Sequence, residues 1–198
     1  RAETRARLSI PEDALVVGTV SRLYREKGHT HLLDAAARLK DACPKLWLLI
    51  VGKGDQREAL EQQAKRLGIA DRVVFTGFYD DLPGALRAMD IFAQPSIDHE
   101  GFPTAVLEAQ GAGLPVIASD IGGTIETLNP GVTGLLVPPA DSAALAEAMR
   151  TLALDDAKRS AMAAAARPWI ESQFTLDDMI AQMTQMYHDA VAAYRARA

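Results

Sequence analysis

Two short stretches of the chain are apolar throughout instead of alternating with polar residues, and this feature restricts the possible folds most. Residues 15–20 read LVVGTV and residues 46–51 read LWLLIV. A half-exposed strand alternates apolar and polar side chains, whereas a strand covered on both faces is apolar throughout. Both stretches are therefore predicted to be central strands of a parallel sheet. The second, the longest unbroken apolar run, is far too short to span a bilayer.

Further strands and helices are expected to alternate along the chain. The other short, branched runs between turn-forming residues are 73–75, 91–94, 116–118 and 134–137. Helical spacing of apolar residues appears in 31–39, 57–67, 143–152, 155–167 and 175–194. Strands that alternate with helices form right-handed crossovers and a parallel sheet. The predicted fold is α/β: a Rossmann-like, doubly wound, parallel six-stranded sheet with C-terminal helices. Its ligand is expected at the carboxyl ends of the strands.

The chain is expected to form one domain with a helical tail. No internal repeat or low-complexity linker interrupts residues 15–137, and no strand pattern follows residue 142. Residues 1–170 are predicted to be the domain and residues 171–198 a C-terminal amphipathic helix that packs on it. Residues on one side of that helix are Met179, Met183, Met186, Tyr187 and Val191.

Charge and composition exclude several classes of function. With 21 basic and 26 acidic residues among 198, the net charge of −5 gives no long-range attraction for nucleic acid or an anionic membrane. The single cysteine, Cys43, excludes an internal disulfide and indicates a reducing compartment. The acidic runs 80–81 and 98–100 lack the supporting ligands that a metal site needs, so no metal is expected.

Two glycine motifs for nucleotide binding are incomplete. Gly52 and Gly54 follow a predicted strand, but the third glycine of a dinucleotide fingerprint would stand at position 57, which is Arg57. No Gly-Lys-Ser/Thr triplet of a phosphate-binding loop occurs either. A nicotinamide dehydrogenase is therefore disfavoured, and Gly52 and Gly54 are interpreted as a strand-to-helix turn.

The loop after the first strand carries two cations where a doubly wound sheet presents its ligand. Arg22 and Lys27 both lie in this loop, just before a predicted helix. Together they could bind a diphosphate, Arg22 through its planar fork and Lys27 as a point charge. The alternative is an ordinary solvated loop, in which Arg25 adds to the charge and Glu26 supplies a partner.

Residues 100–108, EGFPTAVLE, form the strongest local signal. They follow the predicted strand 91–94, with Pro103 suited to the first turn of a helix. Glu100 is then expected just before this helix and Glu108 roughly two turns inside it. Free amides at a helix start favour an anion, and carboxylates accept hydrogen bonds from sugar hydroxyls. The alternative is that Glu100 caps the helix and Glu108 lies on an exposed face. The amides expected to face a ligand belong to Gly101, Phe102 and Thr104.

These loops, in this order on this strand pattern, resemble a known family. The chain is similar to the C-terminal, nucleotide-sugar-binding half of the retaining GT-B glycosyltransferases, the glycosyl transferases group 1, of the family 4 type. The resemblance rests on the segments SRLYREKG, LLIVGKGDQREALEQQAKRLGIADRVVFTGF, EGFPTAVLEAQGAGLPVIASDIGGTIE and GVTGLLVPPADSAALAEAM. They cover nearly all of residues 15–149. Departures are Ser21 where glycine is common and Ile125 where proline is common.

The resemblance assigns roles to these positions. Arg22 and Lys27 would bind the donor diphosphate and stabilise its growing charge, and Glu100 would bind hydroxyls of the transferred sugar. Glu108 would accept hydrogen bonds from the ribose, and residues 74–78 would border the base. The residues implied to bind substrate are Gly101, Phe102, Pro103, Thr104, Glu108, Val74 and Phe75.

The implied function is that of a donor domain. It would bind a nucleoside-diphosphate sugar for retaining transfer to a saccharide or lipid-linked acceptor in envelope glycan synthesis, with neither metal nor cofactor. An N-terminal acceptor-binding domain would be missing, as Arg1 in place of Met also suggests. The last helix would point toward that domain, which would also make any membrane contact, in a cytoplasmic enzyme. The alternatives are a non-catalytic nucleotide-binding module and a sugar-nucleotide epimerase of related fold.

Overall fold

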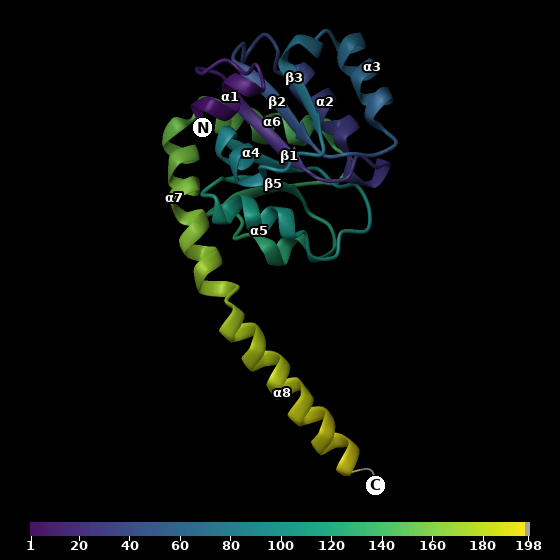
Figure 1. The fold of residues 1–198 in the computed structure, drawn as a ribbon, viewed down its shortest axis with the longest axis vertical. Helices are drawn as coiled ribbons and strands as arrows, with labels where there is room; N and C mark the ends of the chain where they lie inside the picture. Colours follow the sequence, from purple (N-terminus) through teal and green to yellow (C-terminus); the bar gives the residue numbers. More distant parts are fainter. Residues whose placement is uncertain (197–198) are drawn as a thin grey trace.

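The computed structural model describes residues 1–196 and shows a six-stranded, entirely parallel sheet (Figure 1). The strand order is β3-β2-β1-β4-β5-β6, so the chain reverses its direction of winding between β1 and β4. This is the predicted doubly wound topology, whose ligand crevice lies at the reversal. The strands are β1 (Leu15–Val20), β2 (Leu46–Val51), β3 (Val73–Gly77), β4 (Ile91–Gln94), β5 (Val116–Ser119) and β6 (Gly134–Val137).

All six predicted strands are present, four of them with the predicted bounds. β3 is longer by two residues and β5 by one, because both continue into polar positions that an apolar-run criterion leaves out. The two continuously apolar stretches, β1 and β2, pair with each other and lie inside the sheet. Their composition is explained by helices that cover both faces.

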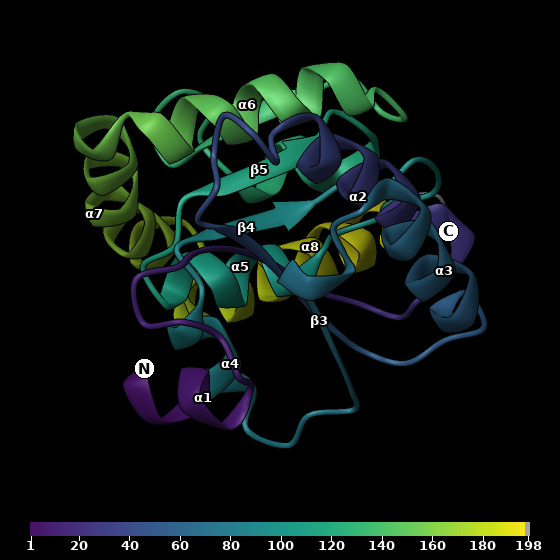
Figure 2. The same cartoon turned by 90° about the horizontal axis from the view of Figure 1, so that it is seen from above.

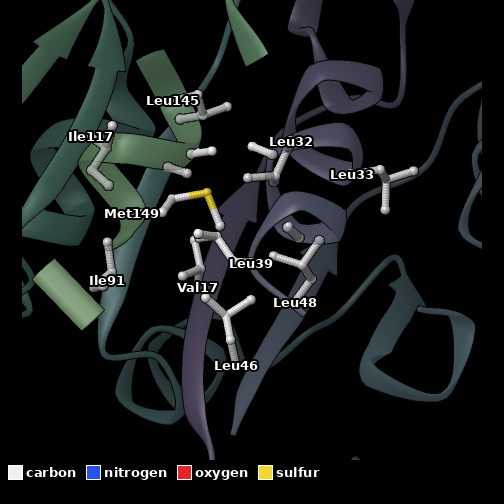
Figure 3. Packing of buried hydrophobic residues seen from close by; sticks show 14 of the residues in the cluster. Val17, Leu32, Leu33, Leu39, Leu46, Leu48, Ile91, Ile117, Leu145 and Met149 are labelled. Atoms are coloured by element: carbon white, nitrogen blue, oxygen red, sulfur yellow. The ribbon is translucent and has the colours of Figure 1, made fainter. Parts of the chain in front are cut away.

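Helices cover each face of the sheet in a separate layer (Figure 2). One layer holds α2 (His29–Arg38), α3 (Arg57–Leu67) and α6 (Ser142–Leu154), and the other holds α1 (Ala2–Arg7), α4 (Leu82–Ala88) and α5 (Thr104–Gly111). On the first face, Met149 of α6 packs with Val17 and Leu39 in a continuous hydrophobic core (Figure 3).

The helix bounds differ from the prediction at both ends, and most at the end of α7 (Asp156–Gln173), which continues six residues past the predicted residue 167. α3 has the predicted bounds, but α2 begins two residues early, because Gly28 adopts a left-handed conformation and starts the helix directly. α1 and α4 were not predicted; both are shorter than eight residues, too short for a clear helical period. Short 3-10 turns cover Arg25–Lys27, Ala70–Arg72 and Gly122–Thr127.

The C-terminal helices leave the domain. α7 (Asp156–Gln173) runs along α5 and α6, and α8 (Leu176–Arg195) then projects away from the domain as a separate rod (Figure 1). No residue of α8 is buried, so the prediction that this helix packs on the domain is wrong within residues 176–195. Its apolar side, with Met179 and Val191, is exposed. The last residues of the predicted tail, 197–198, lie outside the described residues. Within 1–196, none of the helices has the length and apolar character needed to cross a membrane.

Candidate functional site

An ion pair between Lys27 and Glu100 lies where β1 and β4 end, at the reversal of winding. The Lys27 Nζ atom is 3.1 Å from Glu100 Oε1 and 3.0 Å from Glu100 Oε2. Both side chains are largely removed from solvent, with exposed fractions of 15% and 8%. The structure thus brings two predicted site residues from separate loops into direct contact, which the sequence did not indicate.

Two polar residues of the β4 end complete the surroundings of Glu100. Gln94 donates its Nε2 hydrogen to Glu100 Oε2 at 3.1 Å, and the Ser96 hydroxyl donates to the same oxygen. Burial by itself would raise the pKa of Glu100, but the hydrogen bonds from Ser96, Lys27 and Gln94 and the charge of Lys27 outweigh it and lower the pKa. Glu100 is therefore ionised at neutral pH. Among residues 1–196, Lys27 is the only donor to its Oε1, which leaves acceptor capacity on that atom.

Gly28 brings the β1 loop close to the end of β4. Its φ is +69°, and a Cβ at this position would lie 1.9 Å from the Pro95 carbonyl oxygen. The Ile97 amide donates to the Glu26 carbonyl at 2.8 Å, which joins the same two loops. Only glycine permits this approach, and the approach sets Lys27 beside Glu100.

Arg22 lies exposed in the loop that carries Lys27, and within residues 1–196 its guanidinium forms no ion pair with Glu100. Its guanidinium carbon is 4.8 Å from the centre of the Tyr24 ring, a cation-π distance. The loop under it rests on the turn after β2: Gly52 approaches Ser21 so closely that a Cβ would lie 1.9 Å from the Ser21 carbonyl oxygen. Gly54 packs in the same way on Leu23. This confirms that the two glycines form a strand-to-helix turn, whose function is to support the Arg22 loop.

His29, the first residue of α2, is buried beneath the β1 loop with an exposed fraction of only 2%. Its Nε2 atom lies 3.0 Å from the Ser21 hydroxyl, while its Nδ1 has no partner within residues 1–196. Burial, together with the charge of Lys27, lowers the pKa of His29 to about 4. The imidazole is therefore neutral at physiological pH.

We expect the stability of the domain to fall as the pH drops from 6.5 to 4, because the unfolded chain binds a proton on His29 that the folded chain excludes. The full difference between the two pKa values corresponds to a loss on the order of 3 kcal/mol. Urea unfolding of the wild type and of His29→Gln between pH 6.5 and pH 4 measures this loss of unfolding free energy. The variant should lose the part of the pH dependence that comes from His29. Parallel curves of unfolding free energy against pH for the two proteins would contradict the lowered pKa of His29.

The loop 100–103 presents free amides, as predicted. Among the described residues, no protein acceptor pairs with the amides of Gly101, Phe102 or Thr104. α5 begins at Thr104, with Pro103 buried at the position before it. The positive end of this helix therefore faces the same edge of the sheet as Lys27, an arrangement that favours an anion.

Two glycines after β5 pack against the backbone of the loop 100–103. The Gly123 amide donates to the Glu100 carbonyl at 3.1 Å. A Cβ on Gly122 would lie 1.9 Å from that same oxygen, and one on Gly123 would lie 1.8 Å from the Gly101 carbonyl oxygen. These glycines are therefore needed for close packing of two loops.

Glu108 differs from its prediction in position and surroundings. It is the fifth residue of α5, one turn inside the helix rather than two, and it is exposed with no ion-pair partner in the described part of the chain. It lines an open groove of about 540 Å³ between α4, α5 and α7, together with Leu82 and Pro83 at the start of α4.

The segment predicted to border the base, residues 74–78, lies partly inside the sheet. Val74 and Phe75 lie inside β3, where their half-buried side chains pack against the two cores. Phe78, directly after the strand, is 68% exposed, and the Lys53 Nζ atom is 5.3 Å from the centre of its ring. Only the residues from Gly77 onward reach the carboxyl edge of the sheet.

Three supporting residues were missed in the sequence. Gln94 and Ser96 are buried polar residues at and just after the end of β4, and His29 is the buried first residue of α2. A polar residue that ends an apolar strand is the signal that could have identified Gln94 and Ser96. Nowhere in residues 1–196 do three or more His, Cys, Asp or Glu side chains gather closely enough to hold a metal ion.

This architecture, a doubly wound sheet with cations and free amides at its reversal, is the class of fold that binds nucleotides at its carboxyl edge. The model of the family described as "Glycosyl transferases group 1" matches residues 1–169. The chain is 36% identical over 171 residues to the 2-deoxystreptamine glucosyltransferase of Streptomyces kanamyceticus, covering 85% of this chain and 44% of that protein. It is 36% identical over 201 residues to a GDP-mannose-dependent phosphatidylinositol monomannoside mannosyltransferase of Mycobacterium tuberculosis, covering 98% and 52%.

Solved structures agree with these relatives. Anabaena HepE in complex with UDP superposes with a TM-score of 0.87 at 31% identity, covering 95% of this chain and 52% of that one. The C-terminal domain of LpcC, a group 1 glycosyl transferase of Francisella tularensis, gives a TM-score of 0.79 at 26% identity and covers 89% and 93%.

The chain belongs to the glycosyl transferases group 1 family and corresponds to the C-terminal domain of such proteins. It spans about half the length of the curated relatives it matches.

Proposed function

We propose that this chain is the donor-binding domain of a glycosyltransferase that uses a nucleoside-diphosphate sugar and retains its anomeric configuration. The observation that carries the proposal is the Lys27–Glu100 pair at the reversal of winding in a chain of this family. A cation for phosphate and a carboxylate for hydroxyls stand side by side there, which is the composition that a sugar diphosphate requires. The relatives named for sugar transfer, and HepE with its bound UDP, support this reading.

The proposed chemistry follows from charge. When the bond from sugar to diphosphate breaks, negative charge grows on the leaving diphosphate. Lys27 and Arg22 would neutralise that charge, and the amides of Gly101, Phe102 and Thr104 would bind phosphate or sugar oxygens at the positive end of α5. These groups are held by the fold before the substrate arrives, so little reorganisation is needed.

Glu100 would hold the transferred sugar. Its free acceptor capacity on Oε1 faces the site beside Lys27, and an ionised carboxylate accepts hydrogen bonds from sugar hydroxyls. Glu108, exposed in the groove beside α4, would accept from the ribose, and the segment from Gly77 onward would border the base. We propose no metal and no cofactor, because Arg22 and Lys27 supply the charge that the diphosphate needs. Acceptor recognition and membrane contact are assigned to a further domain.

Glu100→Gln in the intact protein tests this function. The substitution keeps the shape of the side chain but removes the charge that orients Lys27 and binds sugar hydroxyls. Transfer from the preferred donor should fall at least roughly tenfold, the equivalent of one charged hydrogen bond. Glu147→Gln, which removes an exposed ion pair of α6, is the matched control and should leave transfer unchanged. A purely nucleotide-binding module would show no transfer that the substitution could reduce.

A further inference from the structure

Three aromatic rings join the loop 100–103 to the end of α7. The Phe102 and Phe174 ring centres are 5.6 Å apart at an interplanar angle of 65°, and those of Trp169 and Phe174 are 5.4 Å apart at 72°. Both pairs have the edge-to-face geometry that aromatic rings favour. Phe102 and Phe174 remain 44% and 36% exposed, so the cluster lies at the surface and outside both cores.

The inner side of this loop is held by many contacts. Glu100 points inward to Lys27, Pro103 is buried, and Gly122 and Gly123 pack against the backbone of residues 100–101. On the outer side, Phe102 extends in the other direction and meets Phe174. The three-ring cluster is therefore the outer support of the segment that carries the free amides.

Phe174 also marks the junction between α7 and α8. It follows the last residue of α7, and Thr175 then caps α8 by accepting a hydrogen bond from the Asp178 amide at 3.0 Å. Phe102 and Leu107 line a groove of about 500 Å³ with this junction and the first turns of α8. The point where α8 leaves the domain (Figure 1) is thus seated against the loop that we assign to the sugar.

We propose that Phe174 is a positioning residue for the transferred sugar. Its ring holds Phe102, and through Phe102 it holds the amides of Gly101, Phe102 and Thr104 against the sugar part of the donor. Arg22 and Lys27, the cations assigned to the diphosphate, lie in a different loop, so loss of the ring should weaken the contacts of the sugar more than those of the diphosphate. The inference rests on the proposed function, since it assigns the donor sugar to this loop.

A purely structural role for Phe174 predicts a different pattern. If the ring only stabilised the domain, its loss would lower the melting temperature and weaken every ligand by the same factor. A positioning role changes the ratio between the affinity for the nucleoside diphosphate and that for the corresponding sugar nucleotide. The ratio is insensitive to a uniform loss of folded protein, so it separates the two roles.

Calorimetry on this chain with Phe174→Ala measures that ratio. The probes are UDP with UDP-glucose and GDP with GDP-mannose, using the pair that the wild type binds. The Kd of the sugar nucleotide should rise roughly two- to tenfold, the effect of losing one aromatic pair, while the Kd of the diphosphate stays within about twofold. Phe174→Tyr should restore the wild-type ratio. Ile180→Ala, an exposed residue of α8 outside the groove, should leave both values unchanged.

Two results would overturn the inference. Equal weakening of both ligands would reduce Phe174 to a packing residue, and unchanged binding of both would remove it from the site. A wild-type chain that binds neither sugar nucleotide would instead contradict the proposed function itself, and this inference with it. Wild-type binding with an unaltered ratio in Phe174→Ala overturns only the inference.

Discussion

Lys27→Ala is expected to lower kcat/KM for the sugar-nucleotide donor by roughly ten- to a hundredfold in the intact protein, because a charged hydrogen bond contributes about 1.5–3 kcal/mol. The structure adds a second reason. Lys27 is bound to Glu100 through both carboxylate oxygens, so its loss also leaves a largely buried carboxylate with only Gln94 and Ser96 as partners. The measurement is the initial rate of transfer as a function of the donor concentration.

The matched control is Lys65→Ala, which removes an exposed lysine from α3, a helix of the opposite layer from α5. It should not change donor kinetics. Because loss of Lys27 also affects the Glu100 surroundings, the melting temperature of each variant has to be recorded. Donor kinetics that stay at the wild-type level in a folded Lys27→Ala protein would remove Lys27 from the site.

Gly28→Ala should destabilise the domain by roughly 2–5 kcal/mol. A left-handed conformation costs a residue with a Cβ about 1–2 kcal/mol, and overpacking adds about 1–3 kcal/mol. The added Cβ would lie 1.9 Å from the Pro95 carbonyl oxygen, a backbone atom that can yield only if the whole loop shifts. Since that shift separates Lys27 from Glu100, nucleotide binding should fall as well. Urea unfolding at neutral pH measures the stability change.

Gly68→Ala separates the cost of the left-handed conformation from the cost of overpacking. Gly68 has nearly the same φ, +67°, but a Cβ there meets nothing within 4 Å. Its substitution should cost only the conformational part, about 1–2 kcal/mol, and leave nucleotide binding unchanged. If both alanine variants lose the same stability, the close approach of Gly28 to Pro95 contributes nothing, and the explanation for the placement of the β1 loop fails.

The strands could be predicted because a strand that is buried on both faces appears in the sequence as a short run of apolar residues. β1 and β2 are apolar at nearly every position, Thr19 being the polar exception, and the turn-forming residues around them set their ends. The helices α1 and α4 are too short to show a period, so the sequence carries no comparable signal for them. α8 shows the opposite error: its amphipathic pattern predicts that one side is covered, but no residue of α8 is buried by the part of the chain that the structure describes.

For the candidate site, the sequence indicated the residues but not their contacts. Arg22, Lys27 and Glu100 follow from charge beside strand ends, whereas the Lys27–Glu100 pair depends on how closely two loops approach. That approach requires a glycine at position 28. A glycine can stand in a loop for several structural reasons, so its presence in the sequence did not indicate this contact. Glu108 is exposed, which is the alternative that the sequence left open, and Gly111 and Ala112 beside it border an open groove.

Calorimetric titration of this chain with UDP, GDP and ADP, and with their sugars and monophosphates, tests the central claim most directly. A diphosphate site built on Lys27 predicts that one nucleoside diphosphate binds more tightly than its monophosphate, and that Lys27→Ala removes most of this difference. Binding of none of these nucleotides at millimolar concentration would contradict the assignment of a nucleotide-sugar site to this edge of the sheet. Equal affinity for the diphosphate and the monophosphate would contradict the role given to Lys27.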